Sequence, residues 1–170
     1  LTSIGAEAFC SCGSLTSFDL PEGLTSIGAE AFDLCNLDSI TIPRSVEKIG
    51  NDAFCANGLS AIIVENGNAV YDSRQNCNAL IETYTNTLIQ GCSKTIIPEG
   101  IVAISDRAFS DCEFSSIQIP NSVESIGNGA FAYCLNLRSI SIPDGITTIG
   151  ENIFEGCYSL NKVFLPNTLT

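Results

Sequence analysis

The chain has 170 residues, with 7 basic and 19 acidic side chains, a formal net charge of −12, and no His, Met or Trp. This acidic balance repels phosphate backbones and anionic lipid headgroups, which argues against binding to nucleic acids or membrane surfaces. Without His, the sequence lacks the usual general base and the commonest neutral metal ligand. No segment approaches the ~20 apolar residues that a membrane-spanning helix requires.

One pattern of 22 or 23 residues recurs along the whole chain. Self-similarity at a fixed period predicts a repeat architecture, in which each unit buries the face of its neighbour and supplies its strand hydrogen bonds. Because the chain opens and closes inside a repeat, we expect it to be part of a longer array. Six regular units flank one irregular unit, with the boundaries 1–23, 24–45, 46–67, 68–100 (irregular), 101–122, 123–145 and 146–168.

Each regular unit is expected to contain a short strand followed by a turn. Ile140-Ser141-Ile142 alternates with period two and is rich in β-branched residues, which predicts a strand with its Ile side chains inward. Pro143-Asp144-Gly145 fits a type I turn, with Pro second and Gly fourth. Stacked units would then join these strands into a continuous parallel sheet.

The remainder of each unit predicts a second extended piece and a corner. Residues 146–149 read as short extended backbone, and Gly150 permits a sharp corner after it. Ala130-Phe131 and Cys134 have helical spacing, which predicts a single helical or 3₁₀ turn. Acidic residues recur just before this turn, where a helix dipole would stabilise them without any calcium site: Glu7, Glu30, Asp52 and Glu151.

These residues resemble the BspA-like (Treponema-type) leucine-rich-repeat family. Its pattern, Leu-x-x-Ile-x-Ile-Pro-x-x-Val-x-x-Ile-Gly-x-x-Ala-Phe-x-x-Cys, is matched by six of the seven units, so the resemblance covers essentially the whole chain. It implies a leucine-rich-repeat solenoid. It also implies a cell-surface or secreted protein of host-associated bacteria, often an adhesin for host matrix or plasma proteins. The pattern describes the scaffold, so no binding residue is implied.

Cysteines recur at one position of the repeat, three residues after the Phe. We expect a ladder of small buried side chains that pack on, or hydrogen-bond to, the turn backbone. Side-by-side parallel Cβ vectors suit disulfides poorly, and a chain without His or a C-x-x-C pair predicts no zinc site. Cys77 and Cys92 flank the irregular unit, where a bridge is the alternative to free thiols. The ladder comprises Cys12, Cys35, Cys112, Cys134 and Cys157, with Asn57 at the same position in the remaining regular unit, 46–67.

The irregular unit predicts a β-hairpin. Residues 79–83 and 87–90 are strand-like and flank Tyr84-Thr85-Asn86. Two interpretations stand side by side. The hairpin is either a binding protrusion with Tyr84 at its tip, or an insertion that keeps the stack continuous while it adjusts the curvature.

The outward positions of the strands form the candidate binding face, because alternate side chains of a strand point to solvent. A flat row of small polar groups suits contact with a protein partner, and it equally suits a merely solvated sheet. Ile63 and Phe164 are the exceptions, as apolar anchors. With the hairpin tip, the candidate residues are Ser39, Thr41, Ile63, Ser116, Gln118, Ser139, Ser141, Lys162, Phe164 and Tyr84.

No catalytic motif is found in the sequence. A Ser or Cys nucleophile would need a Lys partner, and no Lys stands in such a motif; no glycine-rich phosphate loop occurs either. The sequence therefore predicts a protein with no enzymatic activity, cofactor or metal. The predicted function is protein binding at a bacterial surface, as part of an adhesin, and the alternative is a stalk or spacer that displays another domain.

Overall fold

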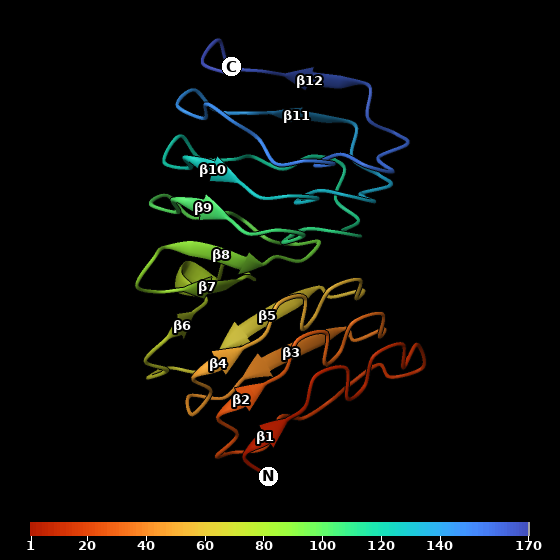
Figure 1. Cartoon of the computed structure of the whole chain (residues 1–170), viewed down its shortest axis with the longest axis vertical. Helices are drawn as coiled ribbons and strands as arrows, with labels where there is room; N and C mark the ends of the chain where they lie inside the picture. Colours follow the sequence, from red (N-terminus) through yellow and green to blue (C-terminus); the bar gives the residue numbers. More distant parts are fainter. Residues whose placement is uncertain (170) are drawn as a thin grey trace.

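The computed structural model describes residues 1–169, which wind into a solenoid with the N-terminus at one end and the C-terminus at the other (Figure 1). Equivalent residues of neighbouring units lie side by side. Ser3 pairs with Ser26, Ser26 with Lys48, and Ser139 with Lys162, all in parallel register. The predicted solenoid of stacked units of 22 or 23 residues is confirmed.

The strands form two rows along the solenoid. The outward row follows the predicted Ile-x-Ile strands and contains β3 (Ser39–Ile42), β5 (Ala61–Val64), β11 (Ser139–Ser141) and β12 (Lys162–Phe164). The corner row lies just before the repeated Gly and contains β1 (Ser3–Ile4), β2 (Ser26–Ile27), β4 (Lys48–Ile49), β9 (Ala103–Ile104) and β10 (Ser125–Ile126). The irregular unit adds β6 (Tyr71–Asp72), the 3₁₀ helix η1 (Arg74–Asn76), β7 (Leu80–Glu82) and β8 (Thr87–Gln90).

The prediction of one continuous parallel sheet is wrong. In the outward row, β3 pairs only with β5 and β11 only with β12, and residues 17–19 and 116–118 form no strand. The corner row divides into β1-β2-β4 and β10-β9-β8-β7-β6. The break follows from the irregular unit, because the Val64 N–H at the end of β5 donates to the Ser73 hydroxyl, 3.0 Å away, and not to a next strand.

The predicted hairpin is confirmed. Strands β7 and β8 pair antiparallel, and β6 adds to β7 on the other side. Strand β8 also pairs parallel with β9, which joins the hairpin to the next regular unit (Figure 1). Tyr84 lies in the connecting turn and is 96% exposed.

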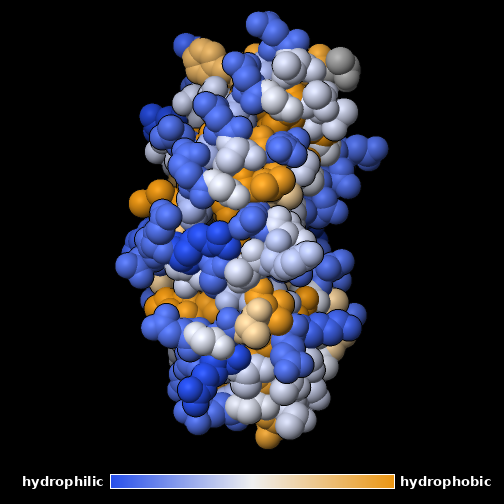
Figure 2. Space-filling model, turned by 90° about the vertical axis from the view of Figure 1, so that its left-hand side faces the viewer, coloured by the Kyte–Doolittle hydropathy of each residue, from blue (hydrophilic) through white to orange (hydrophobic). Residues whose placement is uncertain are grey.

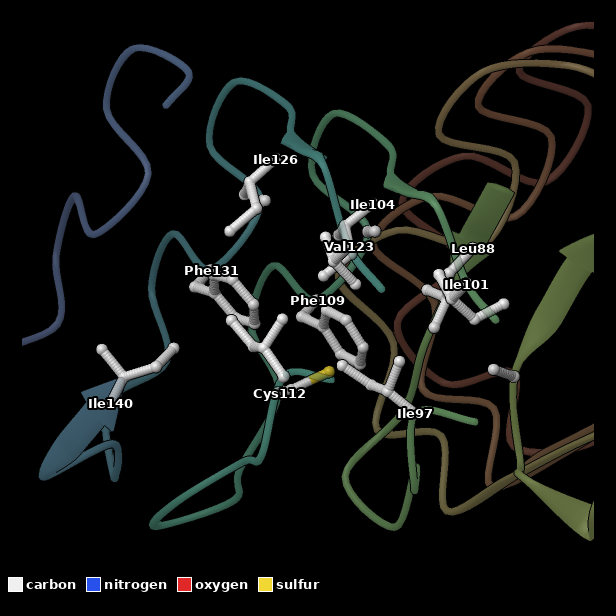
Figure 3. Packing of buried hydrophobic residues seen from close by; sticks show 14 of the residues in the cluster. Leu88, Ile97, Ile101, Ile104, Phe109, Cys112, Val123, Ile126, Phe131 and Ile140 are labelled. Atoms are coloured by element: carbon white, nitrogen blue, oxygen red, sulfur yellow. The ribbon is translucent and has the colours of Figure 1, made fainter. Parts of the chain in front are cut away.

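Stacked phenylalanine rings run through the core. The ring centroids of neighbouring units are 5.1 Å (Phe9–Phe32), 5.6 Å (Phe32–Phe54), 5.2 Å (Phe109–Phe131) and 6.1 Å (Phe131–Phe154) apart. The stack is interrupted at the irregular unit, where Gly91 lies against Phe109 so closely that a Cβ would come within 2.0 Å of the ring. The core accordingly forms two hydrophobic clusters, and Leu88 of the hairpin packs in the C-terminal one with Phe109 and Phe131 (Figure 3).

The predicted helical or 3₁₀ turn at Ala130-Phe131 and Cys134 is wrong. This part of each unit consists of tight turns whose backbone bonds to the next unit. For example, the Phe9 N–H donates to the Ala31 carbonyl at 2.8 Å, and the Phe131 N–H donates to the Ile153 carbonyl at 3.0 Å. Two positions in this part of each unit have a positive φ. The first, two residues before the Phe, is held by Glu7, Glu30, Asp52, Arg107, Gly129 and Asn152. The second, two residues after the Phe, is held by Ser11, Leu34, Ala56, Asp111, Tyr133 and Gly156.

Without a helix, the helix-dipole explanation of Glu7, Glu30, Asp52 and Glu151 fails. The first three instead occupy the first position with positive φ, whereas Glu151 stands one residue before it. Side chains of different charge therefore share one backbone position, which imposes a conformation and not a charge.

The turn after each outward strand also differs from the prediction. In Pro21-Glu22-Gly23-Leu24 the Leu24 N–H donates to the Pro21 carbonyl at 3.2 Å, so Pro is first and Gly third in the turn. Gly23 has a φ of 83°, and a positive φ at the third position is a feature of type II turns. The predicted type I register was shifted by one residue.

The Gly of the corner row is required by close packing between units and not by a special φ. A Cβ on Gly28, Gly50, Gly127 or Gly150 would lie 2.3–2.4 Å from a backbone atom of the preceding unit. Gly5, in the first unit, meets nothing within 4 Å. The repeated Gly therefore permits the backbones of successive corners to touch.

Candidate binding surfaces

The outward row carries most of the predicted binding residues. Ser39 and Thr41 lie on β3, Ile63 on β5, Ser139 and Ser141 on β11, and Lys162 and Phe164 on β12, whereas Ser116 and Gln118 lie in a segment without strand pairing. All of these side chains are exposed except that of Ser139, which is half-buried. Tyr84 is not on this row, because its hairpin pairs with β9 of the corner row.

Ile63 and Phe164 are apolar exceptions on the outward row, 49% and 50% exposed. The ammonium group of Lys162 lies 4.6 Å from the centroid of the Phe164 ring, a cation–π distance. This pair combines an apolar surface with a positive charge at the C-terminal part of the row.

Ile96 is an exposed apolar residue that the sequence-based prediction missed. It is 76% exposed and precedes Ile97, which is buried. The sequence does contain a signal, since Ile97-Pro98 repeats Ile119-Pro120, which places Ile96 at the position of Gln118. The sequence-based prediction missed this signal because it took residues 68–100 as irregular over their whole length.

The cysteine ladder is confirmed as backbone caps at Cys35, Cys134 and Cys157, whereas Cys12 is exposed. Thiols donate to the Phe carbonyl of the preceding unit: Cys35 to Phe9 at 3.1 Å, Cys134 to Phe109 at 3.1 Å, and Cys157 to Phe131 at 3.0 Å. Asn57 caps Phe32 in the same way, with its amide nitrogen 2.7 Å from the carbonyl.

The buried thiols are chemically quiet. Burial raises the pKa of Cys134 and of Cys55 to about 12, so neither is a thiolate nucleophile near neutral pH. All nine cysteines are free. The alternative of a Cys77–Cys92 bridge is thereby contradicted: the Cys92 thiol donates to the Asn78 carbonyl at 3.2 Å and that of Cys77 lies near the Ala79 carbonyl.

A cleft of about 650 Å³ opens in the corner row, between the units 46–67 and 101–122. We call it the corner notch and define it by six of its lining residues: Asp52, Tyr71, Glu82, Asp106, Arg107 and Asn128. Figure 2 looks onto the face that lies on the left of Figure 1, where hydrophilic surface is broken by separate apolar patches. No sequence motif predicts the notch.

The notch is bridged by an ion pair. An Arg107 guanidinium nitrogen lies 3.4 Å from an Asp52 carboxylate oxygen, and both side chains are partly exposed. Burial raises the pKa of Asp52; Arg107 opposes this shift, and the nearby Glu30 and Asp106 carboxylates add to it.

Asp33 lies in the neighbouring unit, within electrostatic range of this ion pair. It is buried, and one of its carboxylate oxygens has no hydrogen-bond partner. Burial raises its pKa, and Arg107 again acts in the opposite direction. The charge of Arg107 therefore stabilises the ionised forms of two carboxylates, Asp33 and Asp52.

A second ion pair holds the irregular unit together. The Arg74 guanidinium and the Asp72 carboxylate lie 2.6 Å apart, and Arg74 also donates to the Asn86 side chain at 2.9 Å. Burial raises the pKa of Asp72, but the hydrogen bonds from Arg74 and Thr83 outweigh this and lower it. Asp72 and Arg74 are thus a compensated pair, unlike Asp52 and Arg107.

Two further properties concern residues 1–169 only. No group of three or more His, Cys, Asp or Glu side chains there is arranged to hold a metal ion. The same residues contain no helix with the length and apolar character needed to cross a membrane.

The sequence profile of the BspA-type leucine-rich repeat region matches residues 2–96 and 81–170, with six copies. Comparison with curated protein sequences gives no significant match.

The solved structures that are similar to the chain include the three described next. A leucine-rich cell surface protein from Faecalibacterium prausnitzii is 28% identical with a TM-score of 0.75, and the match covers 97% of this chain and 57% of that protein. For a leucine-rich repeat protein from Eubacterium ventriosum the identity is 25%, the TM-score 0.84 and the coverage 95% and 44%. The pneumococcal vaccine antigen PcpA, at 23% identity, a TM-score of 0.77 and coverage of 99% and 49%, shows the fold alone. The chain spans about half the length of these proteins.

Proposed function

Because the chain belongs to the BspA-type leucine-rich repeat family, whose solved relatives include a bacterial cell surface protein, we propose that it binds host proteins as part of an adhesin-like protein outside the bacterial cell. Leucine-rich repeat proteins are in general non-enzymatic scaffolds for protein interaction, which supports the first part of this proposal. The host ligand would be a matrix or plasma protein.

The observation that carries the proposal is the outward row itself. The scaffold uses the inward side chains, such as Ile40 and Ile42, which are 2% and 0% exposed. The outward side chains between them make no contribution to the core, and two of them, Ile63 and Phe164, are large and apolar. Interfaces draw most of their energy from a few such anchors surrounded by near-neutral polar contacts.

The test is a binding screen with the full 170-residue chain, immobilised and exposed to purified host matrix and plasma proteins. We expect saturable binding of at least one of them. Phe164→Ser should then weaken binding by roughly tenfold or more, because loss of a hot-spot anchor costs about 2 kcal/mol or more and ~1.4 kcal/mol already corresponds to tenfold. Leu135→Ser is the matched control, since Leu135 is 53% exposed but lies outside the outward row.

Two outcomes would contradict the proposal. The absence of any saturable ligand would favour the spacer that displays another domain. Equal effects of Phe164→Ser and Leu135→Ser would remove the outward row as the binding face. A salt series separates the physical causes, because binding by the acidic surface should weaken steeply with salt while anchoring by Phe164 should not.

A further inference from the structure

The corner notch exists because one layer of the solenoid has a shortened corner. Leu88 of β8 pairs with Ile104 of β9, and the Gly91 N–H donates to the Ala108 carbonyl at 2.7 Å, as the Phe109 N–H does to Ala130 in the next unit. Four residues, 105–108, separate Ile104 from Phe109 in the regular unit, but only residues 89 and 90 separate Leu88 from Gly91.

The missing corner leaves two regular corners facing one another across a gap. Asp52 comes from the unit 46–67, Asp106 and Arg107 come from the unit 101–122, and all three line the same cleft. The shortened layer contributes Ile89 to the lining of the cleft, and the next residue, the buried Gln90, donates its amide to the carbonyls of Gly91 and Ala108, 3.1 Å from each. The notch is thus a defined concave site. At the regular corners of the solenoid this space is filled, because successive units touch one another directly.

The charges in the notch are unbalanced toward the negative. Its lining contains the carboxylates of Asp52, Glu82 and Asp106 and a single cation, Arg107. The Arg107–Asp52 separation of 3.4 Å exceeds the ~2.7–2.9 Å of a strong charge-assisted hydrogen bond. A single loosely held cation therefore shares the notch with three carboxylates, of which Asp106 also accepts the Asn128 N–H at 2.7 Å and Glu82 accepts the Thr85 hydroxyl.

Two independent observations show that this negative charge is under-compensated. One is the unpartnered oxygen of the buried Asp33, which does not line the notch but lies within electrostatic range of Asp52 and Arg107. The other is that Arg107 does not offset the effect of burial on Asp52, whose ionised form stays disfavoured in the fold. A second cation in the notch would be attracted by the Asp52 carboxylate, which lines it.

The notch also offers neutral acceptors and suitable dimensions. The Tyr71 hydroxyl oxygen accepts the Ile49 N–H at 2.9 Å, and both residues line the cleft. An ammonium group carries three donors and no acceptor, so carboxylate and hydroxyl oxygens suit it. A volume of about 650 Å³ lies within the range of sites that enclose a ligand group.

We propose that the corner notch binds a Lys or Arg side chain of a protein partner, in competition with Arg107. The proposal rests on the protein-binding function above and adds a second contact, chemically distinct from the apolar anchors of the outward row. An anionic group is disfavoured there, because it would meet three carboxylates and an Arg that is already paired.

The test uses the full chain and a blocked tetralysine peptide at low ionic strength, with binding measured by calorimetry and by backbone amide NMR shifts. We expect shifts concentrated at residues 49–52 and 103–107. Asp52→Asn should weaken binding by roughly tenfold, since it removes one of the charges that face the bound ammonium group. Asp144→Asn changes the net charge equally at an exposed carboxylate outside the notch and should have little effect.

Arg107→Asn gives a prediction of opposite sign. Asn152 occupies the same repeat position with a positive φ, so Asn is compatible with this backbone. Loss of the competing cation should strengthen tetralysine binding severalfold. Unchanged or weaker binding would overturn the proposal, as would a blocked tetraglutamate peptide that binds the unmodified protein and is lost with Arg107→Asn.

Two further outcomes identify the source of the cation and separate a failure of the notch proposal from a failure of the protein-binding function. If spermine binding depends on Asp52 and tetralysine binding does not, the ligand is a free polyamine and the proposal is wrong. If tetralysine binding ignores Asp52 while a host protein still binds through Phe164, the notch proposal fails and the protein-binding function stands.

Discussion

Replacing Cys134 by Asn should make the protein less sensitive to alkaline pH. Asn57 already occupies the same ladder position in another unit and caps the same kind of carbonyl, so the substitution preserves the local bonding. Cys134 is fully buried, and its pKa is raised from 9.0 to about 12 in the folded protein. The unfolded chain keeps the lower value.

The sign follows from the proton count of the two states. Between the unfolded pKa of 9.0 and the folded pKa of about 12, the unfolded chain loses the thiol proton and the folded protein retains it. The contribution of this thiol to stability is therefore complete below the lower pKa and falls as the pH rises through the window. At a pH of about 10 the loss is ~1.4 kcal/mol.

The assay is urea unfolding followed by circular dichroism under reducing conditions, at pH values of about 7.5 and about 10. The free-energy difference between the unmodified protein and Cys134→Asn should shift by ~1.4 kcal/mol in favour of the variant at the higher pH, because all other titrating groups are shared. Leu137→Ala is the control, since its cost is one of packing and should be equal at both pH values. An unchanged difference for Cys134→Asn would refute the reasoning.

Two other substitutions test the stacking of the units by the same urea assay. Gly127→Ala should lower the free energy of unfolding by roughly 3 kcal/mol or more, because its Cβ would lie 2.4 Å from the Asp106 backbone nitrogen, whereas Gly5→Ala should change it by less than ~1 kcal/mol. Equal effects would show that the corner Gly is not required by contact between units. Asn57→Ala should cost ~1–3 kcal/mol through uncapped carbonyls, and Asn57→Cys should cost clearly less; equal costs would contradict the ladder.

The regular units could be predicted because stacking gives every unit the same environment. The positions of Ile140 and Ile142 alternate with period two and face the core, and the structure buries both to within 3% exposure. The thiols three residues after each Phe were equally predictable, because a small polar group at a fixed position implies a fixed backbone partner.

The tight turns could not be read from residue types. Gly129 indicates a positive φ, but the same position holds Arg107 and Asn152, whose chemistry gives no common signal. The spacing of Ala130, Phe131 and Cys134 imitates a helical turn, whereas the backbone satisfies its N–H groups across units. A long-range hydrogen-bond partner overrode a local spacing.

The corner notch was beyond the sequence for a different reason. Asp52 and Arg107 are 55 residues apart along the chain, and each stands at an ordinary repeat position. Their meeting depends on how many residues the layer between them places at the corner, and that number becomes visible only when Leu88 and Gly91 are aligned with Ile104 and Phe109 in space.

The irregular unit lacks the backbone contact between neighbouring corners that keeps the rest of the solenoid regular. A regular corner must press its backbone against two neighbours, as at Gly127 and Gly150, and it therefore leaves no concave surface. A layer of different length relaxes that contact at one place without breaking the stack, because β8 still pairs with β9. Side chains that are only solvated elsewhere in the array, as Glu7 is, acquire at Asp52 and Arg107 a partly enclosed environment in which charge has energetic consequences. Variation in the length of one unit thus gives the array a site that variation in residue identity alone would not give.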